Sequence, residues 1–183
     1  IKDGDDKISY FQYQRDKDGN IKNIHRIDYE LLKVGGKPLP RFIYVYSAGY
    51  DDGYDAQVVI DGFNVDKFNK FNSDWWREVG VSWKGRGCVV VVLDSVTGEV
   101  KASEIFDIWE KRDREVERLT NFLSKIEEGD YVIMAIGDEA SVKDISEPIR
   151  EAFYKEVRSI GSTQIDKVGF RDSWAIIGGK GIK

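Results

Sequence analysis

The sequence predicts an α/β fold, and two patterns support this prediction. Three apolar runs have the length of a strand: "CVVVVLD" at 88–94, "YVIMAI" at 131–136 and "SWAIIG" at 173–178. Such runs are typical of strands that are covered on both faces. Residues 110–127 carry apolar residues at helical spacing with charged residues on the opposite side, and residues 144–161 have the start and end signals of a second helix. Because strands and helices alternate, we expect one α/β unit.

The N-terminal part is predicted to be extended. Residues 1–45 contain two strand-like runs around Asp18-Gly19-Asn20, a sequence typical of hairpin turns because Gly and Asn tolerate positive φ. The Gly- and Pro-rich stretch "GGKPLPR" follows at 35–41, and we expect the chain to divide there. The sequence therefore predicts a β-rich extension over 1–41 and a main domain over 42–183.

The main domain begins with two expected strands, "RFIYVYSAG" at 41–49 and "AQVVIDG" at 56–62, on either side of an acidic loop. The next stretch is a long loop or a hairpin that carries three tryptophans, Trp75, Trp76 and Trp83. Clustered Trp residues are favoured at protein interfaces because they bury a large area. We therefore treat these three as candidate interface residues.

The C-terminal part predicts its elements in a regular order. These are a strand at 88–94, a turn at 95–99, a strand at 100–109, a helix at 110–127, a strand at 131–136, a helix at 144–161 and a strand at 173–178. The second helix begins with a capping-box pattern, Asp144 to Glu147, with Pro148 in its first turn and Gly161 at its end. The tail "GGKG" is not a phosphate loop, because no helix follows it, and its glycines indicate special backbone conformations.

Composition excludes several classes of function. The formal net charge is −5, so the chain lacks the basic excess that nucleic-acid binding requires. No apolar run is long enough for a membrane-spanning helix, so we expect no membrane insertion. The chain begins at Ile1 and not at Met, and we expect it to be part of a larger protein.

The residues that commonly carry catalysis are scarce. The chain has one histidine, His25, and one cysteine, Cys88, which lies in an apolar run where a buried and inert thiol is expected. A nucleophilic triad would have to span the predicted domain boundary, and the carboxylates show no metal-ligand spacing. We expect a protein that is not an enzyme and that has no cofactor and no metal.

Two loops hold the candidate ligand-binding residues. The segment "DEAS" at 138–141 follows a buried strand, and "FRDSW" at 170–174 leads into the last one. Ligands of open α/β sheets bind in loops of this kind. A sugar would find hydrogen-bonding groups and an aromatic face in this set: Asp138, Glu139, Arg171, Asp172 and Trp174. The alternative is a structural ion pair beside a core tryptophan.

The segments "GRGCVVVVLDSVTGEV", "FDIW", "GDEAS", "VGFRDSW" and "IIGGKG" resemble the interleukin-like EMT inducer (ILEI)/PANDER domain, also called the GG domain. The resemblance is dense from Gly85 to Lys183. It implies a compact α/β fold of two sheets with flanking helices and a non-catalytic role. It also implies sugar binding through Asp138 and Arg171, with Trp174 close by.

These observations lead to one expectation and one alternative. We expect a non-catalytic, glycan-binding module of a larger extracellular or virion-surface protein, such as a bacteriophage fibre or decoration protein. Its partners are then a glycan or neighbouring protein subunits. The alternative is a structural or oligomerisation domain without a ligand, which associates through its aromatic stretch.

Overall fold

The structure is a computed structural model that describes residues 2–3, 7–15, 21–30, 33–34, 37–38, 43–52, 55–60, 63–64 and 86–181. Before residue 43 it describes only the backbones of strands, and these pair with one another: β1 (Lys2–Asp3) with β2 (Lys7–Arg15), β2 with β3 (Ile21–Glu30), and β4 (Lys33–Val34) with β5 (Lys37–Pro38). The antiparallel pairing of β2 with β3 agrees with the hairpin predicted around Gly19. Nothing tests the predicted domain boundary at residue 41.

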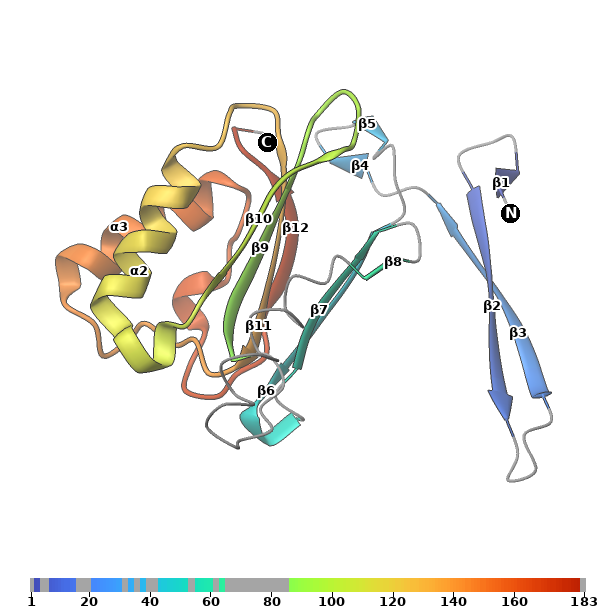
Figure 1. The fold of residues 1–183 in the computed structure, drawn as a ribbon, viewed down its shortest axis with the longest axis horizontal. Helices are drawn as coiled ribbons and strands as arrows, with labels where there is room; N and C mark the ends of the chain where they lie inside the picture. The colour runs from blue at the N-terminus through green and yellow to red at the C-terminus, as the bar shows by residue number, and fades with distance from the viewer. Residues whose placement is uncertain are drawn as a thin grey trace, which may run out of the picture.

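A mixed sheet of seven strands forms the centre of the main domain (Figure 1). Six strands are hydrogen-bonded in the order β10 (Val100–Phe106), β9 (Gly87–Leu93), β11 (Tyr131–Asp138), β6 (Ile43–Gly49), β7 (Asp55–Ile60) and β8 (Phe63–Asn64), and β12 (Ala175–Gly179) also pairs with β11. Every residue of β9 and β11 is buried, as their continuous apolar sequences predicted.

The sheet curls because β11 has two partners along one edge. Its first five residues pair with β12, whereas Gly137 and Asp138 pair in parallel with Ala48 and Gly49 of β6. The helices cover one face of β9 and β11, and the β6–β7 hairpin lies against the other (Figure 1). The predicted α/β class is confirmed, and the two layers of strands belong to one curled sheet.

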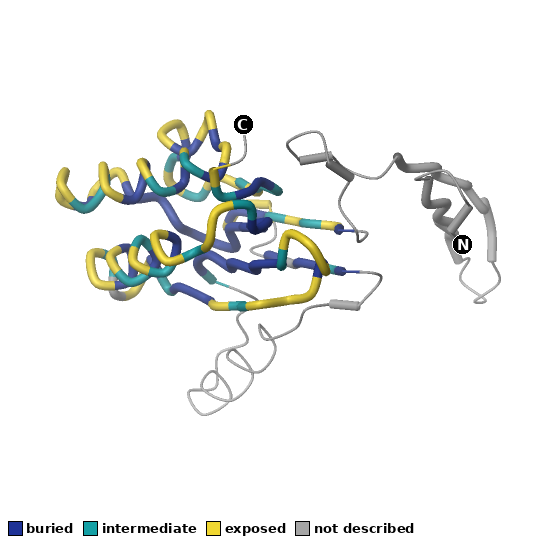
Figure 2. The backbone as a smooth tube through the Cα atoms, turned by 90° about the horizontal axis from the view of Figure 1, so that it is seen from above, coloured by how far each residue is buried: buried dark blue, intermediate teal, exposed yellow. Residues whose placement is uncertain are grey.

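Two apolar cores follow from this arrangement, one on each face of β9 and β11. Alternate residues of β9 enter opposite cores: Val90 packs with the helices, and Val91 packs with β6 and β7. Figure 2 shows buried positions along the strands and on the inward sides of the helices, with exposed positions on the outer sides. Cys88 belongs to the helix-side core, where burial raises the pKa of its thiol to about 12. The prediction of a buried cysteine is confirmed.

In the part of the chain that the structure describes, two α-helices cover the sheet, and their starts differ from the sequence prediction. α2 (Ile108–Ser124) begins two residues earlier than predicted, because the Asp107 carboxylate accepts a hydrogen bond from the Glu110 backbone N–H and ends β10. α3 (Glu147–Ser159) has Ser146 as its N-cap, and no side chain caps this end. The predicted capping box from Asp144 is therefore wrong, although Pro148 does lie in the first turn.

The tail glycines close the fold, as the sequence indicated. A Cβ on Gly178 would lie 2.0 Å from the carbonyl oxygen of Ile160 at the end of α3, so only glycine lets β12 approach the helix this closely. The Gly179 N–H donates to the same oxygen at 3.2 Å. In the described part of the chain, neither helix is long and apolar enough to cross a membrane.

Candidate functional site

The candidate site lies at the C-terminal end of β11. Because β11 and the end of β6 run in parallel, the segments that follow both strands meet at this edge of the sheet. The 3₁₀ helix η1 (Tyr50–Asp52) follows β6, and the Arg171 loop (residues 168–174) precedes β12. Figure 1 shows η1, the start of α2 and the chain just before β12 at the lower end of the molecule.

Asp138 is the last residue of β11 and is only 5% exposed. Its backbone φ is +62°, a left-handed conformation that non-glycine residues rarely adopt. Burial raises the pKa of its carboxyl above the ordinary value, and the positive charges of Arg86 and Arg171 offset only part of this effect. Asp138 is therefore held in a strained backbone conformation, in surroundings that disfavour the charged form of its carboxyl.

Arg171 is held in the same rare conformation, with φ of +63°. Its backbone N–H donates to the Glu139 carboxylate, whose other oxygen accepts from the Ser141 N–H at 2.5 Å. Glu139 is 3% exposed. The Asp172 carboxylate accepts from the Gly169 N–H at 2.7 Å and so closes the loop on itself. One buried carboxylate thus joins the segment after β11 to the segment before β12.

The Arg171 side chain extends over η1. Its guanidinium lies 4.0 Å from the ring centroid of Tyr50 and 3.7 Å from the Asp51 carboxylate. Below it, Ser173 Oγ donates to the Asp52 carboxylate at 2.9 Å and accepts from the Gly49 N–H at 2.9 Å. These contacts fix the Arg171 loop against the end of β6.

Trp174 connects the site to the core. Its backbone N–H donates to Ser47 Oγ at 2.8 Å, and its carbonyl accepts from the Ile136 N–H at 2.9 Å. The half-buried side chain packs against the helix-side core. Trp174 thus packs on the core, as the structural alternative predicted, and also lines a surface cavity.

An open cavity of about 310 Å³ lies beside Arg171. Its lining residues are Asp52, Gln164, Lys167, Val168, Arg171, Asp172, Ser173 and Trp174. They supply a guanidinium and an ammonium as donors, carboxylates as acceptors, and one face of an indole. This size is at the lower end of the range for small-molecule sites.

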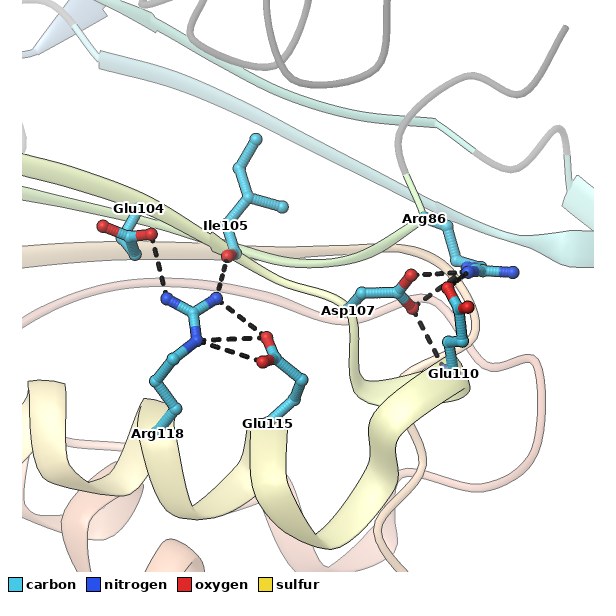
Figure 3. A network of polar contacts seen from close by, with 7 residues as sticks. All are labelled: Arg86, Glu104, Ile105, Asp107, Glu110, Glu115 and Arg118. Carbon is cyan, nitrogen blue, oxygen red and sulfur yellow. Dashed lines mark hydrogen bonds and ion pairs between the residues drawn. The ribbon is translucent and has the colours of Figure 1, made fainter. Parts of the chain in front are cut away.

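A second polar network fixes the start of α2 near the site (Figure 3). The half-buried Arg86 donates to both oxygens of Asp107, at 3.0 and 2.5 Å, and to Glu110 at 3.0 Å. Its charge also lowers the pKa of Asp138, though by less than burial raises it. This bidentate pair attaches the first turn of α2 to the start of β9.

Comparison with known proteins identifies the family. The family model described as interleukin-like EMT inducer matches residues 86–182, just over half of the chain. The chain belongs to the interleukin-like EMT inducer family. It is 37% identical over 99 residues to Protein FAM3C of Danio rerio and 35% identical over 99 residues to Protein FAM3C of Homo sapiens. In both cases the match covers 54% of this chain and 40% of the relative.

A larger relative shares the same region. The chain is 34% identical over 100 residues to the cell migration-inducing and hyaluronan-binding protein of Mus musculus, a match that covers 55% of this chain and 7% of that protein. The chain thus spans well under two thirds of each of these relatives. The similarity concerns the shared interleukin-like EMT inducer region and not the whole proteins.

Within this interleukin-like EMT inducer fold, the predicted site residues have different positions. Arg171, Asp172 and Trp174 line the cavity, whereas Asp138 and Glu139 are buried beside it. The sequence alternative of a structural ion pair named no partners; in the structure the Arg171 guanidinium faces Asp51, and the Asp172 carboxylate accepts from the Gly169 N–H. The candidate interface residues Trp75, Trp76 and Trp83 lie outside the described residues.

The sequence reasoning missed the contribution of η1. Tyr50, Asp51 and Asp52 contact the Arg171 loop, yet they precede it by about 120 positions. Their run of tyrosine and aspartates was visible as an acidic loop after a strand. Nothing local indicated that this strand would pair with β11 in parallel and so bring the loop to the site.

In the described part of the chain, no group of three or more His, Cys, Asp or Glu side chains is placed to hold a metal ion.

Proposed function

We propose that the chain is a non-catalytic glycan-binding module whose ligand occupies the cavity at Arg171. One observation carries the proposal: in the described part of the chain, Asp138 and Arg171 are the two non-glycine residues with positive φ, and Glu139 joins their segments. Strained conformations of this kind persist where the surrounding structure enforces them, and they cluster at ligand sites.

The cavity offers what a neutral sugar requires. Sugar hydroxyls both donate and accept hydrogen bonds, and here Arg171 and Lys167 donate while Asp52 and Asp172 accept. The indole of Trp174 offers an apolar surface for the ring hydrogens of a pyranose. Burial disfavours the charged form of the Asp138 carboxyl, so this residue does not stabilise the fold by being charged. Titratable residues in such surroundings are typical of functional sites.

The comparisons support an extracellular setting. One relative is named for binding hyaluronan, a polysaccharide that lies outside cells. On this basis we propose that the module acts on extracellular glycans as part of a larger protein. A narrower version of this proposal places the module on a virion surface, in a fibre or decoration protein. Such a protein would bind the glycans of a host cell through the same kind of site.

The test is a titration of the isotope-labelled chain, followed by NMR. The probes are N-acetylglucosamine, its β-linked disaccharide, mannose, and the disaccharide of hyaluronan. We expect chemical-shift changes at Asp138, Arg171 and Trp174 that saturate with at least one probe, and that are lost in Arg171→Ala. This variant should lose about 1 kcal/mol of stability or less, because the guanidinium is part exposed and its ion pair with Asp51 lies at the surface.

Arg158→Ala is the matched control. Arg158 is also a surface arginine, stacked on a tyrosine (5.4 Å from the Tyr154 centroid) and 3.7 Å from the Asp166 carboxylate, but it lies on α3. Its loss should leave the titration unchanged. If no probe shifts the site residues while both variants stay folded, glycan binding is wrong, and the structural or oligomerisation domain becomes the better description.

A further inference from the structure

Exposed aromatic rings continue from the Arg171 cavity across the surface. We define the aromatic strip as Trp109, Phe170, Arg171 and Tyr50. The rings of Trp109 and Phe170 lie 6.0 Å apart, and the Arg171 guanidinium lies 4.9 Å from the Phe170 centroid and 4.0 Å from that of Tyr50. These residues come from α2, the Arg171 loop and η1, which are far apart in the sequence. The strip is therefore a product of the fold.

The two rings on the α2 side of Arg171 are open to solvent. Phe170 is 57% exposed and Trp109 is 42% exposed, although large apolar side chains are usually covered. The two exposed rings are not isolated on the surface, because they contact each other and Phe170 contacts Arg171 at the cavity. A contiguous exposed apolar patch with polar residues around it marks a binding surface.

The backbone segments that carry both rings are fixed by hydrogen bonds. Trp109 lies in the first turn of α2, which Arg86 attaches to β9 through Asp107 and Glu110. Phe170 precedes the strained Arg171, whose N–H is fixed by Glu139. A preorganised surface loses little entropy when a ligand binds, so this arrangement favours recognition of a defined shape.

The charges around the strip are balanced. Arg112 lies 5.3 Å from the Trp109 centroid and 3.1 Å from the Asp144 carboxylate, and Arg171 lies 3.7 Å from Asp51. Each guanidinium that touches a ring thus has a carboxylate beside it. A charged polymer would meet both signs, whereas a neutral chain of sugars would find stacking surfaces edged by hydrogen-bonding groups.

We propose that the aromatic strip binds successive units of a neutral, linear oligosaccharide, with one unit in the Arg171 cavity and the following units over Phe170 and Trp109. This inference rests on the proposed function and extends it from a single sugar to a chain. It predicts that affinity depends on chain length, and that the strip accounts for the gain.

The experiment measures affinity by calorimetry for the full chain against homologous neutral series of one to six units: β1,4-linked N-acetylglucosamine, β1,4-linked glucose and mannose oligomers. Acidic hyaluronan oligomers of matching length form a fourth series. We expect the hexamer of one neutral series to bind at least about tenfold more tightly than its monomer, since two stacked rings contribute. The double variant Phe170→Ala with Trp109→Ala should lose this gain, so that its hexamer binds no more tightly than its monomer.

Tyr44→Ala is the control for removing an exposed aromatic ring. Tyr44 is 47% exposed but lies near the start of β6, at the other end of the strand from Gly49 and η1. Equal affinity for monomer and hexamer, a gain that survives in the double variant, or a preference for the acidic series would each overturn the inference while leaving the proposed function standing. Absence of binding in all four series would remove both.

Discussion

At the scale of single residues, the site is defined by backbone strain and by one buried carboxylate. Asp138 and Arg171 both have φ near +60°, which costs free energy for any residue with a Cβ. Glu139 joins their two segments, since it accepts from the N–H groups of Arg171 and Ser141. The sequence predicts Glu139 as a ligand contact; in the structure it is buried, and both of its carboxylate oxygens accept from backbone N–H groups, so we expect it to act as a positioning residue.

Glu139→Gln should therefore destabilise the fold without changing its shape. A glutamine has one acceptor oxygen, so its NH₂ group would face one of the two N–H donors and leave a buried donor unpaired. We expect a loss of about 1–3 kcal/mol in the free energy of unfolding, measured by urea denaturation. Glu117→Gln, an exposed substitution on α2, should cost less than about 0.5 kcal/mol. Equal effects for the two variants would contradict this role.

Asp138→Asn should stabilise the chain at neutral pH. Burial raises the folded-state pKa of Asp138, so the folded chain holds this proton to higher pH than the unfolded chain does. Stability therefore falls as pH rises from the ordinary aspartate pKa, about 3.9, toward the raised folded value. Asparagine removes this loss and also tolerates positive φ. Denaturation at pH 3 and pH 7 should show the advantage of the variant growing with pH, and a constant difference would disprove the buried-charge argument.

At the scale of elements, apolar runs predict the buried strands well, whereas the predicted starts of the two helices differ from the structure because of how each helix is capped. The sequence predicts β9 and β11 clearly, because both faces of these strands are buried and their sequences are therefore continuously apolar. The sequence predicts the start of α2 two residues late, because Asp107, the N-cap of this helix, lies in the segment predicted as a strand. At α3 the sequence matches the capping-box pattern from Asp144 to Glu147. The N-cap is Ser146 instead, and no side chain makes the capping hydrogen bond.

The candidate site was partly predictable for a related reason. Residues near each other in sequence, such as Asp138 with Glu139 and Arg171 with Trp174, could be recognised from loops next to buried strands. The contribution of η1 could not, because it depends on the parallel pairing of Asp138 with Gly49. Such pairing is decided by tertiary packing, and no local periodicity encodes it.

The site depends on Gly49, the last residue of β6, which lies directly against the Arg171 loop. A Cβ at this position would lie 1.8 Å from the carbonyl oxygen of Arg171, so Gly49→Ala must push the Arg171 loop away from β6. We expect this variant to lose the sugar-dependent NMR shifts and about 1–3 kcal/mol of stability. Ala48→Gly is the matched control, since it should lower stability through a buried methyl group but leave binding intact. Retained binding in Gly49→Ala would show that the loop contact is dispensable.

The edge strand β10 is protected from further pairing. Its register shifts between Val100 and Ala102, and the Ile105 carbonyl accepts a hydrogen bond from Arg118 at 2.5 Å (Figure 3). A bulge and a charged group on the strand edge are both means by which natural sheets avoid edge-to-edge association. The cavity of about 720 Å³ between β10 and α2 is thus unfavourable for an added strand.

At the scale of the whole molecule, the site lies where the two layers of the curled sheet meet. The β6–β7 hairpin covers one face of β9 and β11, the helices cover the other, and β11 contributes to both. The Arg171 loop lies against the end of β6 and the end of β11 at once. The geometry of the site therefore depends on how the layers are joined, and the proposed binding requires both layers.

This dependence gives the last prediction, which concerns the boundary at residue 41. Among the described residues, the strands before residue 43 pair with one another and with no later strand, whereas β6 pairs with both β7 and β11 and buries Ile43 and Ala48. Chain 42–183 should therefore melt within about 3 °C of the full chain, a difference of about 1 kcal/mol for this size. Chain 50–183, which lacks β6, should show no cooperative transition. If 42–183 behaves like 50–183 in calorimetry, the N-terminal strands belong to the folding unit and the predicted boundary is wrong.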